Sequence, residues 1–258
     1  MKRPDVAAPS SADAVVRRAL DYPYPVPPHS YLYDISAPGH WRSLSLDPKH
    51  FERRTPVLAA GSNRAPERLA QKFQRSFPNA TIPVTRAHLT GFDSVYCAHV
   101  TSYGSVPATL HPSPGTTVTL HITWLADDEL ACMHETEQPG INYHFVHMKG
   151  LDLTVDGGPR LDAAYAYLSA HGAMLENGAP VALAAIAAAN RRFSARDQSE
   201  MLARVAARVA PGVAVLDFIR DVVGIEDDRG ALRARHETLL RRSVERFPFE
   251  TVDIVPVG

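Results

Sequence analysis

Cysteine is nearly absent from this chain. Only Cys97 and Cys132 occur among its 258 residues, and they form no CxxC pair or other regular spacing. Their scarcity excludes a disulfide framework and a cysteine-based zinc site, both of which need several cysteines at characteristic intervals. Because a chain without disulfides suits a reducing compartment, we expect a cytoplasmic location.

An excess of charge of either sign is also lacking. The chain has 27 Lys and Arg residues against 28 Asp and Glu residues, which gives a formal net charge of -1. Proteins that follow a phosphate backbone or an anionic membrane surface concentrate positive charge. We therefore expect neither a nucleic acid nor a membrane as a partner.

Long apolar runs are missing as well. No stretch contains the about 18 consecutive apolar residues of a membrane span. The first residues, MKRPDVAAPSSADAVV, begin with a basic pair but lack the continuous apolar segment of a secretory signal. We expect a soluble, non-exported chain with one catalytic domain plus extensions, at a length that allows a sizeable core.

Proline, by contrast, is plentiful near the start. Residues 1–55 include DYPYPVPPHSYLYDIS, whose prolines favour extended or turn backbone and suppress helix. This segment is predicted to be an arm that wraps a core. Next, TPVLAAGSNRAPERLAQKF combines an apolar run, a Gly-Ser-Asn turn and a helix that starts near Pro66, with Leu69 and Phe73 four residues apart.

Strand and helix patterns follow in two groups. Short β-rich runs between Pro and Gly turns occupy residues 81–155, and AYAYLSA indicates a further strand. Ser194 and Asp197 resemble a cap for the helical pattern QSEMLARVAARV, and two more helical patterns follow. This order predicts three segments: a Pro-rich arm at 1–55, a catalytic domain at 56–208 and a helical extension at 209–258.

The stretch ATLHPSPGTTVTLHITWLADDELACMHETE, residues 108–137, is rich in structural signals. Ser-Pro-Gly at 113–115 predicts a turn. The residues that then alternate with Thr and His, as in a half-buried strand, are Val118, Leu120, Ile122 and Trp124. Three acidic residues from Asp127 onward open a short helix, where the positive end of the helix dipole favours them.

One face of that helix combines apolar residues with a carboxylate. A rotation of about 100° per residue aligns Leu130, Met133, His134 and Glu137, while Glu135 points the other way. If this face is buried, desolvation should raise the pKa of Glu137 and make it a useful base. The same spacing suits a helix-terminal glutamate that reaches water or pairs with an arginine, so spacing alone leaves both interpretations open.

These residues resemble the gamma-glutamylcyclotransferase family. The likeness runs without a gap from Ala108 to Glu137, through a strand, Ser-Pro-Gly, a second strand, an acidic helix and a closing Glu-x-Glu. The family's upstream Tyr-Gly-Ser-Asn element is matched by GSN at 61–63, with Ala60 in place of the tyrosine. The resemblance covers roughly residues 56–208. It implies an α+β fold, a small mixed or antiparallel β-barrel with surrounding helices and a cavity at its mouth.

The resemblance also implies a site and a reaction. Glu137 corresponds to the general acid/base, and the residues that would contact the substrate are Ala60, Gly61, Ser62, Asn63, His134 and Tyr143. Backbone amides at a glycine turn before a helix suit the α-carboxylate of a small-molecule substrate. The substrate's α-amine attacks its own γ-carbonyl, so no enzyme nucleophile or cofactor is required. The products are 5-oxoproline and an amine or peptide.

Some positions depart from the family pattern. Ala60 removes a tyrosine, His134 replaces an Asp, and Gln138 and Leu120 each replace a Gly. Because a pocket that leaves a substrate polar group unpaired discriminates strongly against that substrate, these changes point away from glutathione itself. Two alternatives stay open: a hydrolase or lyase of the same fold acting on another small amide, and a non-catalytic binding or scaffold protein.

Three further points concern metal, Tyr143 and self-association. His134, Glu137 and His144 offer ligands for a metal ion, but no HExxH or comparable spacing occurs, so we expect no metal. The sequence suits two roles for Tyr143: a residue of the site, or one of the aromatic side chains that fill the barrel. The Arg-rich pattern RARHETLLRRSVERF has an apolar face for the domain itself or a neighbouring subunit, which leaves a homodimer open.

Overall fold

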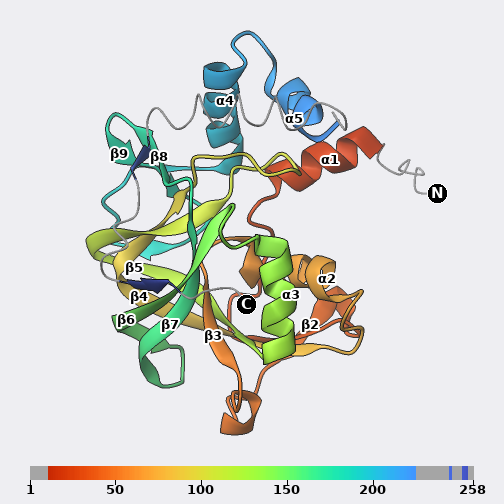
Figure 1. The fold of residues 1–258 in the computed structure, drawn as a ribbon, viewed down its shortest axis with the longest axis vertical. Coiled ribbons are helices and arrows are strands. Elements are labelled where there is room, and N and C mark those ends of the chain that lie inside the picture. Colours follow the sequence, from red (N-terminus) through yellow and green to blue (C-terminus); the bar gives the residue numbers. More distant parts are fainter. Residues whose placement is uncertain (1–10, 225–243, 246–251, 255–258) are drawn as a thin grey trace, which may run out of the picture.

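The computed structural model describes residues 11–224, 244–245 and 252–254, and within them five strands close into a barrel (Figure 1). These strands are β3 (Thr55–Ala59), β4 (Thr81–Tyr96), β5 (Ala108–Leu125), β6 (Tyr143–Val155) and β7 (Arg160–Ser169). Their order is β5, β3, β7, β6, β4, and β4 pairs with β5 to complete the circle. Of the five strand pairs that close the barrel, only β3–β7 is parallel. The expected α+β fold with a small mixed barrel is confirmed.

The strand expected at residues 118–124 is confirmed as part of β5, but it is not half-buried, because His121 and Thr123 on the opposite face are buried as well. The turn predicted before it is also wrong. Val118, Leu120 and Ile122 are fully buried in the core. Ser-Pro-Gly at 113–115 lies inside β5, where the register with β4 shifts beyond Thr90. Gly115 has a φ of 84° and therefore forms part of a bulge that bends the strand without reversing the chain.

Short strands extend the barrel sheet and form a second sheet. In the first, β1 (Tyr31–Asp34) pairs with β4 and β2 (Trp41–Ser43), β10 (Ala182–Leu183) with β4 and β12 (Ala195–Arg196), β11 (Ala188–Ala189) with β5, and β14 (Val252–Ile254) with β6. In the second, β8 (Ala173–Glu176) lies between β9 (Ala179–Pro180) and β13 (Val244–Glu245). The strand expected at AYAYLSA is β7. The three segment boundaries stay a prediction, and β1 joins the sheet from within the first segment.

Helices gather in two places around the barrel (Figure 1). Beside it, α2 (Pro66–Phe73) packs against α3 (Asp127–Glu137). At one end, α5 (Val215–Gly224) contacts both α1 (Ser11–Leu20) and α4 (Gln198–Val209). The described residues also include three short 3-10 turns: η1 (Pro38–His40), η2 (Pro48–His50) and η3 (Ser62–Arg64). No helix in the described part of the chain is long and apolar enough to cross a membrane.

The helix expected at QSEMLARVAARV is confirmed as α4. Asp197 caps it by accepting a hydrogen bond from the Glu200 backbone N–H, and the Glu200 side chain accepts one from the Asp197 backbone N–H in return. The helix expected over residues 231–247 lies largely outside the described residues. For residues 244–245 the helix prediction is wrong, because these residues form β13, which pairs with β8.

A hydrophobic cluster fixes α2 and α3 on the barrel. Leu69 and Phe73 of α2, Met133 of α3 and Val57 of β3 belong to this cluster and are buried. Each such side chain stabilises the fold by about 1.5–3 kcal/mol. This packing therefore fixes the positions of the polar residues on the same two helices, Lys72 on α2 and Glu137 on α3.

Candidate active site

A cavity of about 380 Å³ brings together residues that lie far apart in the sequence. Its walls come from α1, the loop after β3, the segment 99–108, the end of α3 and the start of β6. The predicted site residues that line it are Ala60, Gly61, Ser62, Asn63, Glu137 and Tyr143. The loop and the carboxylate that the sequence singled out thus face the same space.

The barrel geometry explains why Glu137 lies near Asn63. β3 and β5 are antiparallel, with Thr55 opposite Leu125 and Ala59 opposite His121. The chain leaves β5 at the end far from the Gly-Ser-Asn loop, and α3 must return along the barrel to reach it. An 11-residue helix covers about 16 Å at 1.5 Å per residue, close to the length of the five-residue β3.

The loop after β3 is held tightly on both sides. The Ser94 hydroxyl donates to the Ala60 carbonyl (2.6 Å), and Ser62–Arg64 form the 3-10 turn that leads into α2. Pro66 stands in the first turn of α2, where its missing N–H costs nothing. A Cβ on Gly61 would overlap the Tyr22 hydroxyl. Only glycine therefore fits between the arm and the cavity at this position.

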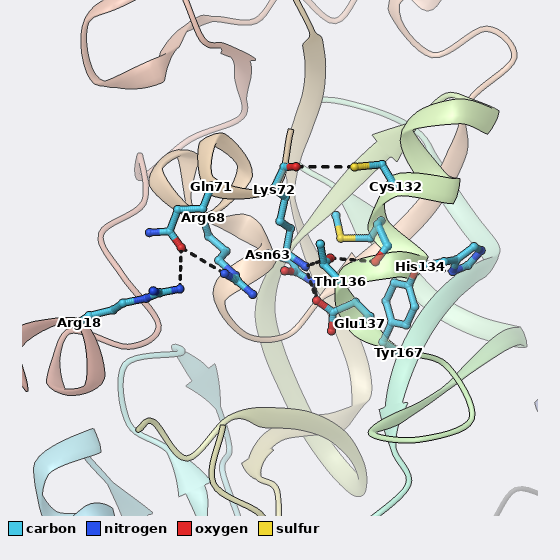
Figure 2. A network of polar contacts seen from close by, with 11 residues as sticks. Arg18, Asn63, Arg68, Gln71, Lys72, Cys132, His134, Thr136, Glu137 and Tyr167 are labelled. Carbon is cyan, nitrogen blue, oxygen red and sulfur yellow. Dashed lines mark hydrogen bonds and ion pairs between the residues drawn. The ribbon is translucent and has the colours of Figure 1, made fainter. Parts of the chain in front are cut away.

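The Glu137 side chain, about 9% exposed as a residue, forms a buried ion pair (Figure 2). Its Oε1 accepts hydrogen bonds from the Lys72 ammonium and from the Asn63 amide, the latter at 3.3 Å. Lys72 also donates to the Thr136 hydroxyl (2.6 Å). Asn63 therefore connects the Gly-Ser-Asn loop directly to the carboxylate.

The pKa of Glu137 is shifted in the direction opposite to the predicted one. Burial is the largest single effect and raises its pKa, but the charge and hydrogen bond of Lys72 and the other partners of the carboxylate together outweigh burial, and the net direction is below the ordinary value of a glutamic acid. Arg68 and the Asn63 amide act in the same direction. The prediction of a raised pKa is therefore wrong, because it considered desolvation without a cation. The group is a carboxylate at neutral pH.

Lys72 is the partner of Glu137 that the sequence interpretation missed. Its side chain is 1% exposed. Burial lowers its pKa to about 8, against the attraction of Glu137, which raises it. A signal existed, since Lys72 follows the buried Leu69 by three residues and precedes the buried Phe73. A lysine on the apolar face of a short helix indicates a buried partner of opposite charge.

His134 stands behind the cavity wall and not in it. Its Nδ1 is 2.7 Å from the Tyr167 hydroxyl, and its ring packs against Phe145. Tyr167 lines the cavity, whereas His134 does not. The structure does not bring His134 to the cavity with the other predicted residues, because the aromatic rings of Phe145 in β6 and Tyr167 in β7 pack against it, and its contact with a substrate stays a prediction. Tyr143 does line the cavity, and burial raises its pKa well above 10.

The N-terminal arm contributes to the cavity, which the sequence interpretation also missed. Arg18 of α1 and Tyr22 line it together with Arg68 and Tyr103. The Tyr22 hydroxyl accepts a hydrogen bond from the Ala108 N–H (2.8 Å). The arm thus reaches the first residue of β5, at the mouth of the barrel.

Within the described ranges, no group of three or more His, Cys, Asp or Glu side chains is arranged to hold a metal ion. The residues that line the cavity offer a carboxylate, guanidinium groups, amides and phenols. Such groups bind anions and amides and move protons.

Two solved structures are similar to this chain. One is described as a gamma-glutamyl cyclotransferase, with 14% sequence identity, coverage of 76% of this chain and 91% of that chain, and a TM-score of 0.37. The other is an uncharacterized protein from Homo sapiens, with 14% identity, the same coverage and a TM-score of 0.38. No protein-family model and no curated protein matches the sequence. A functional assignment therefore depends on the site itself.

Proposed function

We propose that this protein cleaves a γ-glutamyl or closely related amide by intramolecular attack of the substrate's own amine. The observation that supports this most strongly is the shared cavity of Glu137 and the loop from Gly61 to Asn63. A volume of about 380 Å³ suits a small molecule and lies within the range of ligand pockets. The reaction requires two things from the protein: a folded-back substrate and a group that moves one proton.

In the proposed reaction, the α-amine nitrogen attacks the γ-carbonyl carbon and forms the new C–N bond. The C–N bond to the leaving amine breaks, and its electron pair stays on the leaving nitrogen. Glu137 accepts the proton from the attacking amine and delivers it to that nitrogen, so it ends the cycle as a carboxylate. The products are 5-oxoproline and a free amine, with no change in oxidation state.

The geometry of the ion pair suits this role. Both hydrogen bonds to Glu137 that involve Asn63 and Lys72 reach Oε1, which leaves Oε2 as the oxygen for proton exchange. Because its pKa is lowered, Glu137 is already ionised at neutral pH and ready to act as a base. Lys72 holds the carboxylate in place through its second bond to Thr136. Backbone N–H groups after Gly61 supply a position for the substrate α-carboxylate.

Product analysis tests this proposal. The purified protein is incubated with a panel of γ-glutamyl dipeptides and γ-glutamyl amines, and 5-oxoproline, glutamate and the released amine are quantified by mass spectrometry. Equal amounts of 5-oxoproline and amine support cyclisation. Glutamate in place of 5-oxoproline contradicts cyclisation and supports the hydrolase alternative. No product from any compound contradicts both.

A further inference from the structure

A buried arginine directly follows the Gly-Ser-Asn loop. Arg64, in η3, is 7% exposed. Its Nη2 donates to the Ala185 carbonyl (3.3 Å), and its Nε has no hydrogen-bond partner among the described residues. None of the ion pairs in the described part of the chain includes it. Burial lowers its pKa to about 10, so the guanidinium is charged at neutral pH. Because a buried charge without an opposite charge is costly to the fold, this position favours an anion.

A buried histidine with unused nitrogens lies close to this arginine. His121 of β5 is 2% exposed, and neither of its ring nitrogens makes a hydrogen bond within the described ranges. Burial lowers its pKa to about 3, and the charges of Arg64 and Arg86 act in the same direction, against the smaller effect of the Pro27 carbonyl. The ring is therefore neutral at pH 7 and has one N–H to donate. Most buried polar groups have partners, so two such groups side by side point to a ligand.

The two side chains share one enclosed region between the N-terminal arm and the barrel. Tyr31 of β1 touches both residues, since its hydroxyl donates to the Arg64 carbonyl (2.6 Å) and its ring centroid is 6.3 Å from that of His121. The turn η3 packs on β5, the strand that carries His121. Neither Arg64 nor His121 lines the cavity that contains Glu137. The region is therefore distinct from the candidate active site, although it adjoins the same loop.

The donors define the chemistry of the ligand. The Arg64 Nε–H and the N–H of a neutral imidazole both need an acceptor, and the charge of Arg64 favours an acceptor that is negative. One positive charge matches a monovalent anion. The enclosure by side chains favours a small ion over an organic acid. A water molecule would accept the same hydrogen bonds but would leave the guanidinium charge unneutralised.

We infer that Arg64 and His121 bind a small monovalent inorganic anion, of the size of chloride, beneath the Gly-Ser-Asn loop. Such an ion stabilises the folded chain by neutralising Arg64. It also fixes η3, and with it Asn63, whose amide donates to Glu137. The inference concerns a second binding site and does not depend on the proposed reaction.

Thermal unfolding in two sodium salts tests this site. The protein is heated in mixtures of sodium chloride and sodium gluconate at constant total concentration, so that screening of surface charges stays the same. Gluconate is too large for an enclosed site. We expect chloride to raise Tm by about 3 °C or more and to reach saturation, as for a ligand that binds only the folded state. Bromide should act like chloride. A Tm that does not depend on the halide would overturn the inference and would fit bound water.

Three variants relate the effect to the two residues. R64M removes the charge and should abolish the response to chloride, whereas R75M, at an exposed arginine, is the control and should respond like the wild-type protein. H121L removes one donor and keeps the charge, so the chloride concentration for half of the effect should rise about tenfold. A wild-type response in R64M would overturn the site, and one in H121L would remove the histidine from it.

Bromide in crystals of the wild-type protein locates the ion directly and covers the case in which R64M does not fold. We expect an anomalous-scattering peak between the Arg64 guanidinium and the His121 ring. Peaks confined to the molecular surface would show an adventitious ion only and would overturn the site, even if chloride raises Tm. None of these measurements uses 5-oxoproline, so the site and the proposed reaction can fail separately.

Discussion

At the scale of single residues, the site depends on the pairing of Glu137 with Lys72. A buried carboxylate without a cation would be protonated at neutral pH, and a buried ammonium without an anion would lose its proton. As a pair, Glu137 stays ionised and Lys72 stays protonated. The consequence for chemistry is a base of modest strength that is available over a wide pH range.

Removal of the lysine should therefore change the pH profile of the reaction. In K72M, burial is no longer opposed by the ammonium, so the pKa of Glu137 rises. We expect the acid limb of kcat/KM to move to higher pH by at least one unit, as measured by 5-oxoproline release from pH 4 to 9. K49M, at an exposed lysine, serves as the control and should keep the wild-type profile. An unshifted limb in K72M would show that another group sets it.

The same ion pair makes the free energy of unfolding depend on pH in a defined direction. The pKa of Glu137 is lower in the folded state, so its contribution is present above about pH 4.5 and is lost as the pH falls through the folded value. We expect E137Q to lower the free energy of unfolding at pH 7 by about 3–5 kcal/mol, because Lys72 is left buried and unpaired. Urea denaturation should show that this deficit shrinks below pH 4.5.

A double variant checks that explanation. K72M/E137Q removes both charges, so it should recover most of the stability that E137Q loses, since no unpaired charge remains in the interior. A double variant as unstable as E137Q would mean that packing, and not charge pairing, accounts for the loss.

How far the sequence predicted these residues follows from the kind of signal each one gives. The spacing with Met133 drew attention to Glu137 but left its role open, and the assignment of both Glu137 and the Gly-Ser-Asn loop came from the family resemblance. Lys72 was not identified, since a lysine on a helix usually faces water and its partner lies 65 residues away. That His134 lies behind Tyr167 could not be predicted, because the spacing defines a helix face but not which aromatic rings cover it.

At the scale of elements, the loop after β3 and the N-terminal arm fit one another. The family-like motif lacks its tyrosine at position 60, and Tyr22 places a phenol against Gly61 from the arm. Its hydroxyl is held by the Ala108 N–H. The proline-rich arm therefore completes the wall that the substituted loop leaves open.

This fit predicts the effect of a single methyl group. In G61A, the new Cβ overlaps the Tyr22 hydroxyl and displaces it from Ala108. We expect a loss of about 1–3 kcal/mol in the free energy of unfolding and a raised KM. In G61A/Y22F, the missing hydroxyl gives the methyl group room, so the double variant should be more stable than the sum of its single changes implies. Strict additivity would contradict the contact.

Elements with a strong local pattern were predicted well, and those defined by distant contacts were not. α2, α4 and β5 follow from apolar periodicity, caps and Pro66. The bulge at Gly115 looked like a turn, because glycine at positive φ serves both structures and only the pairing with β4 decides between them. The strand at Val244 depends on β8, which precedes it by about 70 residues, and local sequence carries no signal of that pairing.

At the scale of the whole molecule, barrel closure determines which distant segments share the cavity. α1, the Gly-Ser-Asn loop, the segment 99–108 and the end of α3 are separate in sequence and meet only because β3, β4 and β5 are neighbours in one closed sheet. The resemblance predicted the barrel and the meeting of the loop with Glu137. It could not predict that the N-terminal arm lines part of the cavity, since the arm lies outside the residues that carry the resemblance.

Hydrogen exchange should reveal these segments as one binding unit. With γ-glutamylglycine bound to E137Q, in which we expect turnover to be strongly slowed, amide exchange should be slower in residues 60–64, in residues 99–108 and at the end of α1. The hairpin of β8 and β9, outside the cavity, should exchange at the rate of the free protein. Protection confined to a different region would place the ligand elsewhere.

The most direct measurement is the rate of 5-oxoproline formation by E137Q and E135Q beside the wild-type protein, with folding checked by circular dichroism. Both substitutions remove one carboxylate from α3, but only Glu137 lines the cavity. If E137Q fails to fold, K72M/E137Q takes its place. We predict that loss of the Glu137 carboxylate slows the reaction at least a hundredfold, while E135Q stays within twofold of wild type. Near wild-type turnover in folded E137Q would contradict the assignment of Glu137 as the proton carrier.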